Sequence, residues 1–246
     1  MVPQEVDHVR RAVAAKMLSI VRPLTKREVT NRDMTRGRNF LDLHRPVLDS
    51  AFQETGIAPT TVASIVWIET NFGTYTGKFH TLNSLTSLAA LFLPRVQKRT
   101  AEQSKALAKE ESEEMERDNG WREVDWENRT KEIGAKWYEE LKSYLRLCKQ
   151  LDWDPHEMKG SWAGAIGYGQ FLPSTLLSLI GDRKVDIWNW NDMLPLIAKH
   201  LSELGWTEKG SDQEKGSAIQ RYNAPRAYLD SVLEMKSRLE QTEATP

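Results

Sequence analysis

The sequence contains very little cysteine, no long hydrophobic run and almost no excess of charge of either sign. Cys148 is the only cysteine among 246 residues, which excludes an intrachain disulfide and a cysteine-based zinc site. A single thiol is typical of a buried core residue, and a catalytic nucleophile is the less favoured alternative. No segment reaches the roughly 18 apolar residues of a transmembrane helix. The first residues also lack the apolar stretch of a signal peptide, so none is visible, and Met1 is either the native start or a start that follows a removed leader.

Basic and acidic side chains nearly balance. Lys plus Arg number 34 and Asp plus Glu number 35, which gives a formal net charge of -1. This balance provides no overall field that would attract nucleic acid or an anionic membrane, so neither is predicted as a partner. The five histidines are scattered without the spacing of metal ligands, and we expect no metal and no other cofactor. A content of 39% hydrophobic and 28% charged residues is typical of a globular chain.

Helical periodicity dominates, and no segment alternates as a β-strand does. Apolar residues recur at helical spacing in residues 5–20 and 40–54, and the polar residues 25–39 between them are predicted to be an exposed connection or a short helix. A helix is predicted to start at Pro59 and to end near Gly73. Further helices are predicted at about 173–180, 191–204, 212–221 and 225–240. The fold class is therefore mainly α.

The charge-dense residues 95–120 and the amphipathic residues 131–149 are predicted to form a helical hairpin, joined near Gly120. A solvated helix face explains the charges better than an acidic binding tail does. We predict one domain over residues 1–246, with this hairpin as a sub-lobe or insertion at about 95–150.

Glu69 stands out because its same-face neighbours on the predicted helix, Val62, Ile65 and Val66, are all apolar. Burial disfavours the charged carboxylate, and so does the C-terminal end of a helix dipole. Both effects raise the pKa, as a general acid requires. A core glutamate paired with a buried Arg or Lys is an equally weighted alternative from this helix alone.

Residues 160–174 read G-S-W-A-G-A-I-G-Y-G-Q-F-L-P-S. The glycines allow a close approach of the backbone to a ligand, and the amide of Gln170 suits a sugar hydroxyl or acetamido group. Pro173 is predicted to open a helix. The segment lacks the G-K-[ST] ending of a phosphate-binding loop and does not follow a βαβ pattern, so that reading is disfavoured.

Together these motifs resemble the membrane-bound lytic transglycosylase B family. Residues 69–73, E-T-N-F-G, resemble its E-T-x-x-G motif, residues 160–174 match its long glycine-rich motif, and residues 221–223 resemble its third motif. The likeness runs from about residue 40 to residue 235. It implies a lysozyme-like helical fold and a location in the periplasm or cell envelope. It also implies that the glycan strands of peptidoglycan are the binding partner and the substrate that is cleaved.

The resemblance also implies roles for single residues. Glu69 aligns with the one catalytic acid/base of the family. The residues that it implies for substrate binding are Ser161, Tyr168, Gln170, Tyr222, Asn223, Arg95 and Tyr228. The chain departs from the family at Val96, where a second arginine is expected. It also departs at residues 180–190, where some members have a calcium loop but Asp182 and Asp186 are the only acids here, so no calcium site is expected.

A single motif carboxylate suits a transglycosylase, because the 6-hydroxyl of the muramic sugar can replace water as the nucleophile. We therefore predict cleavage between N-acetylmuramic acid and N-acetylglucosamine with 1,6-anhydro ends, a lyase reaction. Two alternatives stay open. One is a lysozyme-type hydrolase that uses Asp182, Asp186 or Asp192 as a second carboxylate. The other is a catalytically silent glycan-binding protein.

Overall fold

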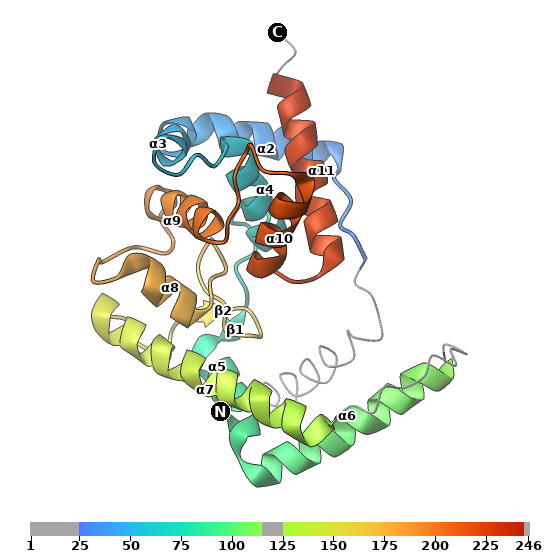
Figure 1. Cartoon of the computed structure of the whole chain (residues 1–246). Coiled ribbons are helices and arrows are strands. Elements are labelled where there is room, and N and C mark those ends of the chain that lie inside the picture. Colours follow the sequence, from blue (N-terminus) through green and yellow to red (C-terminus); the bar gives the residue numbers. More distant parts are fainter. Residues whose placement is uncertain (1–24, 115–124, 244–246) are drawn as a thin grey trace. The chain divides into compact units, whose positions relative to one another are not determined.

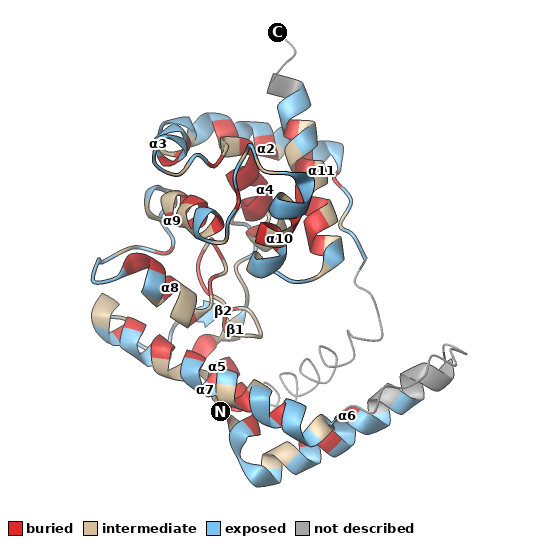
Figure 2. Ribbon diagram, viewed as in Figure 1, coloured by how far each residue is buried: buried red, intermediate tan, exposed pale blue. Residues whose placement is uncertain are grey.

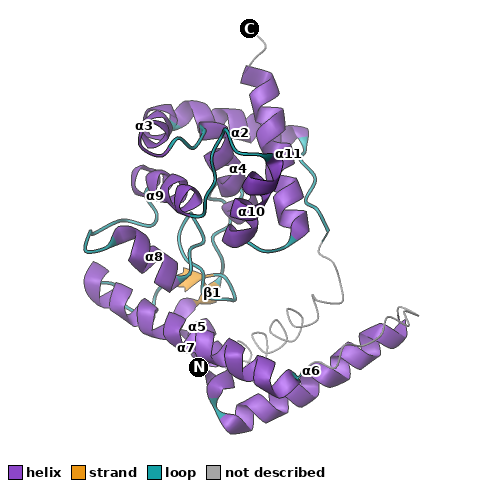
Figure 3. Cartoon of the chain, in the orientation of Figure 1, coloured by secondary structure: helices purple, strands orange, loops and turns teal. Residues whose placement is uncertain are grey.

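The computed structural model describes residues 25–114 and 125–243, so the helix predicted over residues 5–20 lies outside the described residues. Helices dominate these ranges, with loops and two short strands between them (Figures 1 and 3), which confirms the mainly α prediction. The α-helices are α2 (Asn31–Leu43), α3 (Arg45–Thr55), α4 (Pro59–Thr70), α5 (Thr81–Ala89), α6 (Pro94–Glu114), α7 (Trp126–Leu151), α8 (Pro173–Ile180), α9 (Trp190–Glu203), α10 (Asp212–Tyr222) and α11 (Arg226–Glu243). None of the described helices is both long enough and apolar enough to cross a membrane.

The chain divides into two compact units. Among the described residues, unit 1 comprises residues 77–114, residues 125–166 and Leu172–Leu177. Unit 2 comprises residues 25–76, Gly167–Phe171 and residues 178–243. The predicted helical hairpin lies within unit 1, as α6 and α7. A single domain over residues 1–246 stays a prediction.

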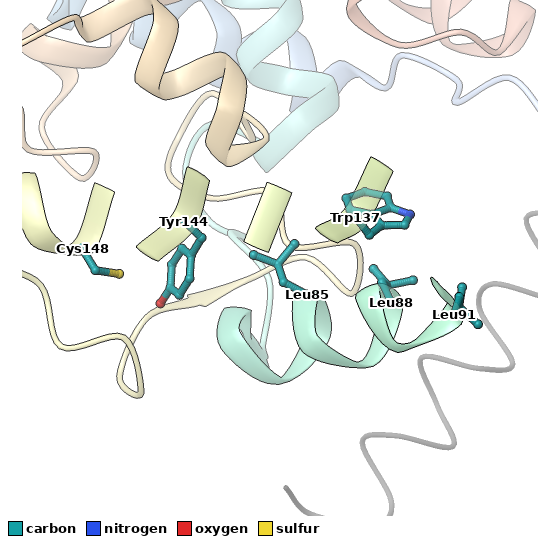
Figure 4. Packing of buried hydrophobic residues seen from close by; sticks show 6 residues of the cluster. All are labelled: Leu85, Leu88, Leu91, Trp137, Tyr144 and Cys148. Atoms are coloured by element: carbon teal, nitrogen blue, oxygen red, sulfur yellow. The ribbon is translucent and has the colours of Figure 1, made fainter. Parts of the chain in front are cut away.

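The core of unit 1 lies between α5, the short 3₁₀ helix η1 (Ala90–Phe92) and α7. Figure 4 shows six of its buried side chains: Leu85, Leu88, Leu91, Trp137, Tyr144 and Cys148. Gly134 lets α7 approach η1 closely, because a Cβ there would lie 2.3 Å from the backbone nitrogen of Phe92. Cys148 is a buried thiol, as predicted, and burial raises its pKa.

Unit 1 also contains a pair of short strands and a hydrogen-bonded contact with a buried carboxylate at the start of α8. Strands β1 (Phe79–His80) and β2 (Lys159–Gly160) pair antiparallel, with Phe79 opposite Gly160. Strands of two residues are too short to leave an alternating pattern, and sequence reasoning missed them. At the start of α8, Ser174 donates from its backbone nitrogen and its hydroxyl to the buried carboxylate of Glu140, at 2.9 and 2.6 Å. This contact supports the helix start that Pro173 predicts.

Unit 2 is built around α4, which packs against α2, α3, α9 and α11. Residues 60–67 of α4 are all buried (Figure 2), so this helix is enclosed on every side rather than on one stripe. Its own apolar side chains include Val62, Ile65 and Trp67, each of which has no exposed surface.

The polar residues 25–39 were only partly understood from their composition. Most of them form α2, which starts with a capping box in which Thr30 and Asp33 each accept a hydrogen bond from the other's backbone nitrogen. The apolar stripe of residues 40–54 is divided between α2 and α3. The break falls at His44 because Pro46 fits the first turn of a new helix and not the interior of a continuous one.

Candidate active site

Glu69 lies in the last turn of α4, and its carboxyl group contacts α11. Tyr228, at the start of α11, donates a hydrogen bond from its hydroxyl to Oε1 of Glu69 at 2.8 Å. In the described ranges 25–114 and 125–243, no Arg or Lys forms an ion pair with Glu69. Within these ranges, the alternative that Glu69 is a core glutamate paired with a buried Arg or Lys is therefore not supported.

Burial raises the pKa of Glu69 from its ordinary value of 4.5 to about 7, and the hydrogen bond from Tyr228 opposes this only in part. The direction predicted from the sequence is confirmed. The residue as a whole keeps part of its surface exposed, while its carboxyl group is deep enough for desolvation to dominate. At neutral pH this side chain is thus present in both protonated and ionised forms.

Two tyrosines surround the carboxyl group. Burial raises the pKa of both Tyr222 and Tyr228 well above the ordinary value, and the charge of Glu69 raises each further. Both hydroxyls therefore stay protonated and act as donors. Tyr228 donates to Glu69, while Tyr222 donates to the backbone oxygen of Gly169 at 2.8 Å. The Tyr222 contact joins α10 to the glycine-rich segment within unit 2.

The chain leaves α4 through a left-handed turn. Asn71, Phe72 and Gly73 have φ values of 50°, 56° and 76°, a region that glycine tolerates and other residues rarely adopt. The hydroxyl of Thr70 accepts the backbone N–H of Gly73 at 3.0 Å. A Cβ on Gly73 would lie 2.8 Å from Trp190 and 3.0 Å from Tyr168, so only glycine allows these rings to pack on the turn.

Two arginines donate hydrogen bonds to the end of α4 and to this turn, and sequence reasoning missed both. Arg27 donates to the backbone oxygen of Trp67 and to Oδ1 of Asn71, each at 3.0 Å. Arg36 donates to the backbone oxygen of Asn71 at 2.6 Å. They satisfy carbonyl groups at the C-terminal end of α4. No local signal could have found them, because both precede α4 by more than twenty residues.

Residues 167–171 of the glycine-rich motif belong to the same unit as Glu69. Gln170 has a positive φ of 47° and donates from Nε2 to the backbone oxygens of Gly167 at 2.9 Å and Thr76 at 3.3 Å. Both amide hydrogens are thereby used on the chain itself. No described group donates to its amide oxygen, which is the atom left for the predicted contact with a sugar.

An aromatic group accompanies these polar residues. Tyr168 stacks on Trp190 with ring centroids 3.8 Å apart, and Trp188 meets Tyr168 edge to face at 5.7 Å. Trp188 is 38% exposed. Trp67, Trp137 and Trp206, by contrast, are buried.

The remaining predicted substrate residues are less closely tied to Glu69. Asn223 is exposed and ends α10. Ser161 and Arg95 belong to unit 1. The hydroxyl of Ser161 accepts the backbone N–H groups of Ala163 and Ala165, so it shapes the glycine-rich loop, and Arg95 is exposed in the first turn of α6.

The acidic residues that follow α8 are used in local turns. Asp192 accepts the backbone N–H of Asp186 at 2.7 Å, and Asp186 accepts that of Trp188 at 2.8 Å. In the part of the chain that the structure describes, no three His, Cys, Asp or Glu side chains come together as a metal site would require. The sequence-based expectation of no calcium site stays a prediction.

The chain was compared with known proteins. Residues 11–215 match the family described as the transglycosylase SLT domain. The chain is also 24% identical over 188 residues to the membrane-bound lytic murein transglycosylase B of Escherichia coli K12, an alignment that covers 74% of the chain. It spans only 41% of the length of that relative.

Solved structures share the fold. The lytic transglycosylase Slt35 of Escherichia coli, solved in complex with calcium, superposes with a TM-score of 0.69 at 17% identity and covers 97% of this chain and 84% of its own. SltB3 of Pseudomonas aeruginosa, in complex with NAG-NAM-pentapeptide, gives 0.64 at 18% identity, with 94% and 71% covered. SltB1 of the same organism gives 0.65 at 17% identity, with 99% and 100% covered. The predicted lysozyme-like helical fold is thereby confirmed.

The motifs around Glu69 and residues 160–174, the family match over most of the chain and the shared fold agree. The resemblance inferred from these motifs is confirmed: this chain belongs to the transglycosylase SLT domain family, that of the lytic transglycosylases.

Proposed function

We propose that this protein is a peptidoglycan lytic transglycosylase that cleaves the bond between N-acetylmuramic acid and N-acetylglucosamine and leaves 1,6-anhydro ends. The observation that carries the proposal is the environment of Glu69. Its pKa is raised to about 7 by burial, with a tyrosine hydroxyl as the partner of the carboxyl group. A carboxyl group in this state can give up a proton and take one back near neutral pH.

In the first half of the reaction, protonated Glu69 donates its proton to the glycosidic oxygen. The bond to the muramic sugar breaks, and the acetamido group of that sugar stabilises the cationic carbon. Glu69 is left as a buried anion. The hydroxyl of Tyr228 already points at Oε1 and stabilises this charge as it develops.

In the second half, the Glu69 carboxylate removes the proton from the 6-hydroxyl of the same muramic sugar. The oxygen attacks the anomeric carbon and closes the anhydro ring. No water is consumed, and Glu69 regains its proton for the next cycle. The nucleophile belongs to the bound sugar, so it needs no second carboxylate to activate and hold it.

Names of related proteins support the substrate class. Structures of SltB3 are described as complexes with NAG-NAM-pentapeptide and with NAG-anhNAM-pentapeptide. The relative from Escherichia coli is named as a murein transglycosylase. On that basis we propose that this chain also binds the glycan strands of peptidoglycan. A place in the periplasm or cell envelope follows from the same proposal, since that is where the substrate lies.

The predicted substrate-binding roles are part of this proposal. Tyr222 and Tyr228 support Glu69, Tyr168 and Gln170 contribute a ring and an amide oxygen from the glycine-rich segment, and Asn223 lies exposed next to Tyr222. Ser161 and Arg95 are proposed on the family pattern alone.

A lysozyme-type hydrolase is the second candidate, and it needs another carboxylate. Of the three candidates named from sequence, Asp186 and Asp192 are used as hydrogen-bond acceptors in the turn before α9, and Asp182 is an exposed residue of that connection. These contacts favour the single-carboxylate route.

Mass spectrometry of digested peptidoglycan sacculi tests the proposal. We expect anhydro-ended muropeptides as the main product. Hydrolysis would give reducing ends about 18 Da heavier and would move the protein to the lysozyme class. Binding to sacculi without any released product would identify a silent glycan-binding protein instead.

A further inference from the structure

We propose that a cationic pocket beside the turn after Glu69 binds carboxylate groups of the peptide stems that peptidoglycan strands carry. The inference rests on the proposed function and adds a second recognition site to it. The pocket lies in unit 2, has a volume of about 470 Å³ and is lined by Arg32, Asp33, Arg36, Asn71 and Thr74.

The two arginines that face the pocket have no carboxylate partner. Arg32 and Arg36 lie four residues apart on α2, so their side chains emerge from the same face of that helix. Among the residues that the structure describes, Arg32 is exposed and has neither an ion pair nor a hydrogen bond. Arg36 makes hydrogen bonds only through Nη2, to Asn71 and Thr74, which leaves its other N–H groups available to a ligand.

The one acidic residue of the pocket does not cancel this charge. Asp33 is 8% exposed and is already matched by Arg27, whose Nη2 lies 3.3 Å from its Oδ1. Its oxygens also accept hydrogen bonds from Trp67 and Thr30. The pair of Arg27 and Asp33 is close to neutral, so Arg32 and Arg36 give the pocket a net positive charge. An anion is the ligand that fits.

The proposed substrate supplies the anion. Asn71 and Thr74, which line the pocket, belong to the turn that follows the helix of Glu69. The muramic sugar is the sugar of the strand that carries a peptide, and that peptide contains free carboxylates. Arginine forks recognise carboxylates through paired hydrogen bonds. Strands whose peptides have free carboxylates should therefore be preferred over strands in which these groups are neutral.

The test compares two substrates. One is peptidoglycan strands with their stem peptides, and the other is the same strands after the peptide carboxylates have been converted to neutral amides. We expect a higher kcat/KM for the strands with free carboxylates at low salt. The variant Arg32→Gln should lower the ratio of the two kcat/KM values roughly threefold, as for an exposed charge pair, and Arg32→Lys should restore part of it.

Arg38→Gln is the matched control, since Arg38 is an exposed arginine of the same helix that does not line the pocket. It removes the same charge and should leave the ratio unchanged. An unchanged ratio in Arg32→Gln, or an equal fall in Arg38→Gln, would overturn the pocket while leaving the proposed function intact. Cleavage of neither substrate by the unmodified protein would overturn the proposed function instead.

A binding experiment distinguishes recognition of peptide carboxylates from recognition of any anion, such as phosphate, and does not depend on turnover. The probe is the dipeptide N-acetyl-L-alanyl-D-glutamate, titrated into the full chain carrying Glu69→Gln while amide chemical shifts are recorded. We expect shifts at Asn71 and Thr74 that are lost when Arg32→Gln is added. If inorganic phosphate at the same concentration produces equal shifts, the site is a general anion site, and recognition of peptide carboxylates is rejected.

Discussion

Two glutamates contact helix α4 at opposite ends and have pKa values shifted in opposite directions. Glu69 belongs to the last turn of α4, and its pKa is raised to about 7. Glu208 lies between α9 and α10, accepts hydrogen bonds from Ala58 and Thr61 at the start of α4, and has a lowered pKa. The residue type is the same, so the difference comes from what surrounds each carboxyl group.

Burial acts on Glu208 as it does on Glu69, but donors outweigh it. Trp206, Ala58 and Thr61 all donate to Oε1 of Glu208 at 2.9 Å, and Lys236 lies 3.4 Å from Oε2. The N–H of Ala58 is one of the unpaired groups at the start of α4, where a negative charge is also favoured by the helix dipole. These contacts keep Glu208 ionised.

Glu69 has one donor and a less favourable end of the helix. Within the described part of the chain Tyr228 is the one group that donates to it, and the C-terminal end of α4 repels a negative charge. The two arginines near that end, Arg27 and Arg36, are directed at backbone oxygens and at Asn71 instead of at Glu69. Glu208, which we expect to stabilise the fold, and Glu69, which can release a proton, thus differ in the number of groups that donate hydrogen bonds to their carboxyl groups.

The largest expected effect separates the two glutamates by activity. Glu69→Gln keeps the shape of the side chain but cannot exchange the proton, and we expect cleavage of peptidoglycan to fall about 10³–10⁴-fold. Release of soluble muropeptides measures this, and circular dichroism checks that the helical fold is kept. A variant that clears the substrate at near the original rate would contradict the assignment of Glu69.

Glu208 should matter for stability instead. Glu208→Ala leaves Trp206, Thr61 and the N–H of Ala58 without an acceptor, and we expect a loss of about 2–3 kcal/mol in the free energy of unfolding. Urea denaturation measures it. Glu203→Ala is the control, because its exposed pair with Lys199, at 3.7 Å, should contribute well under 1 kcal/mol. Equal losses in both variants would show that Glu208 does not hold the start of α4.

The raised pKa of Glu69 should also appear in the pH dependence of stability. Between about pH 4.5 and 7 the folded protein keeps the Glu69 proton while the unfolded chain has released it. The folded state binds more protons in this window, so the free energy of unfolding falls as the pH rises through it, by up to about 3 kcal/mol.

Glu69→Gln removes this contribution, while other titrating groups cancel in the comparison. Urea denaturation of both proteins at pH 4.5 and pH 8 measures the difference between them. We expect the variant to gain stability relative to the unmodified protein at the higher pH. A difference that does not change with pH would mean that Glu69 titrates normally.

The smallest expected effect concerns the donor to Glu69. In Tyr228→Phe the hydrogen bond that lowers the pKa of Glu69 is lost, so the alkaline limb of the pH profile of kcat/KM should move to higher pH. We expect kcat to fall about tenfold, because the anion formed after the first proton transfer loses its donor.

Tyr144→Phe in unit 1 is the matched control. It deletes the same atom from a buried tyrosine, whose hydroxyl donates to the backbone oxygen of Pro155. Its effect should be on stability only, with the pH profile unchanged. A pH profile that stays in place in Tyr228→Phe would show that this hydroxyl does not act on Glu69.

Several helix boundaries followed from local chemistry. Pro59 and Pro173 each start a helix at the predicted residue, and α9, α10 and α11 begin or end within a few residues of the predicted positions. These signals are local because proline and the capping residues act on the first turn itself. The short strands were missed because two-residue strands leave no alternating pattern. For residues 25–39 the composition left a connection and a short helix open, and most of them form α2.

The pKa of Glu69 is raised as predicted, but the apolar stripe on its helix is not the full reason. A one-sided apolar stripe was the premise, yet α4 is buried on nearly every side, so the stripe does not distinguish Glu69 from its neighbours on that helix. The long glycine-rich motif and the family resemblance singled out this residue. The aromatic group of Tyr168, Trp188 and Trp190 was only partly recognised, since tryptophan is typical of cores as well as of binding sites.

By itself the sequence determined the helical class, most helix ends, the lone buried thiol and the family, because propensity, capping and motif residues are written locally along the chain. Only the tertiary structure decided the protonation of Glu69, the partner Tyr228, and the arginines that close the turn after α4. Those contacts join residues 35 to 159 positions apart. A pKa depends on the burial and the donors that such distant segments bring to one carboxyl group, and no local pattern records them.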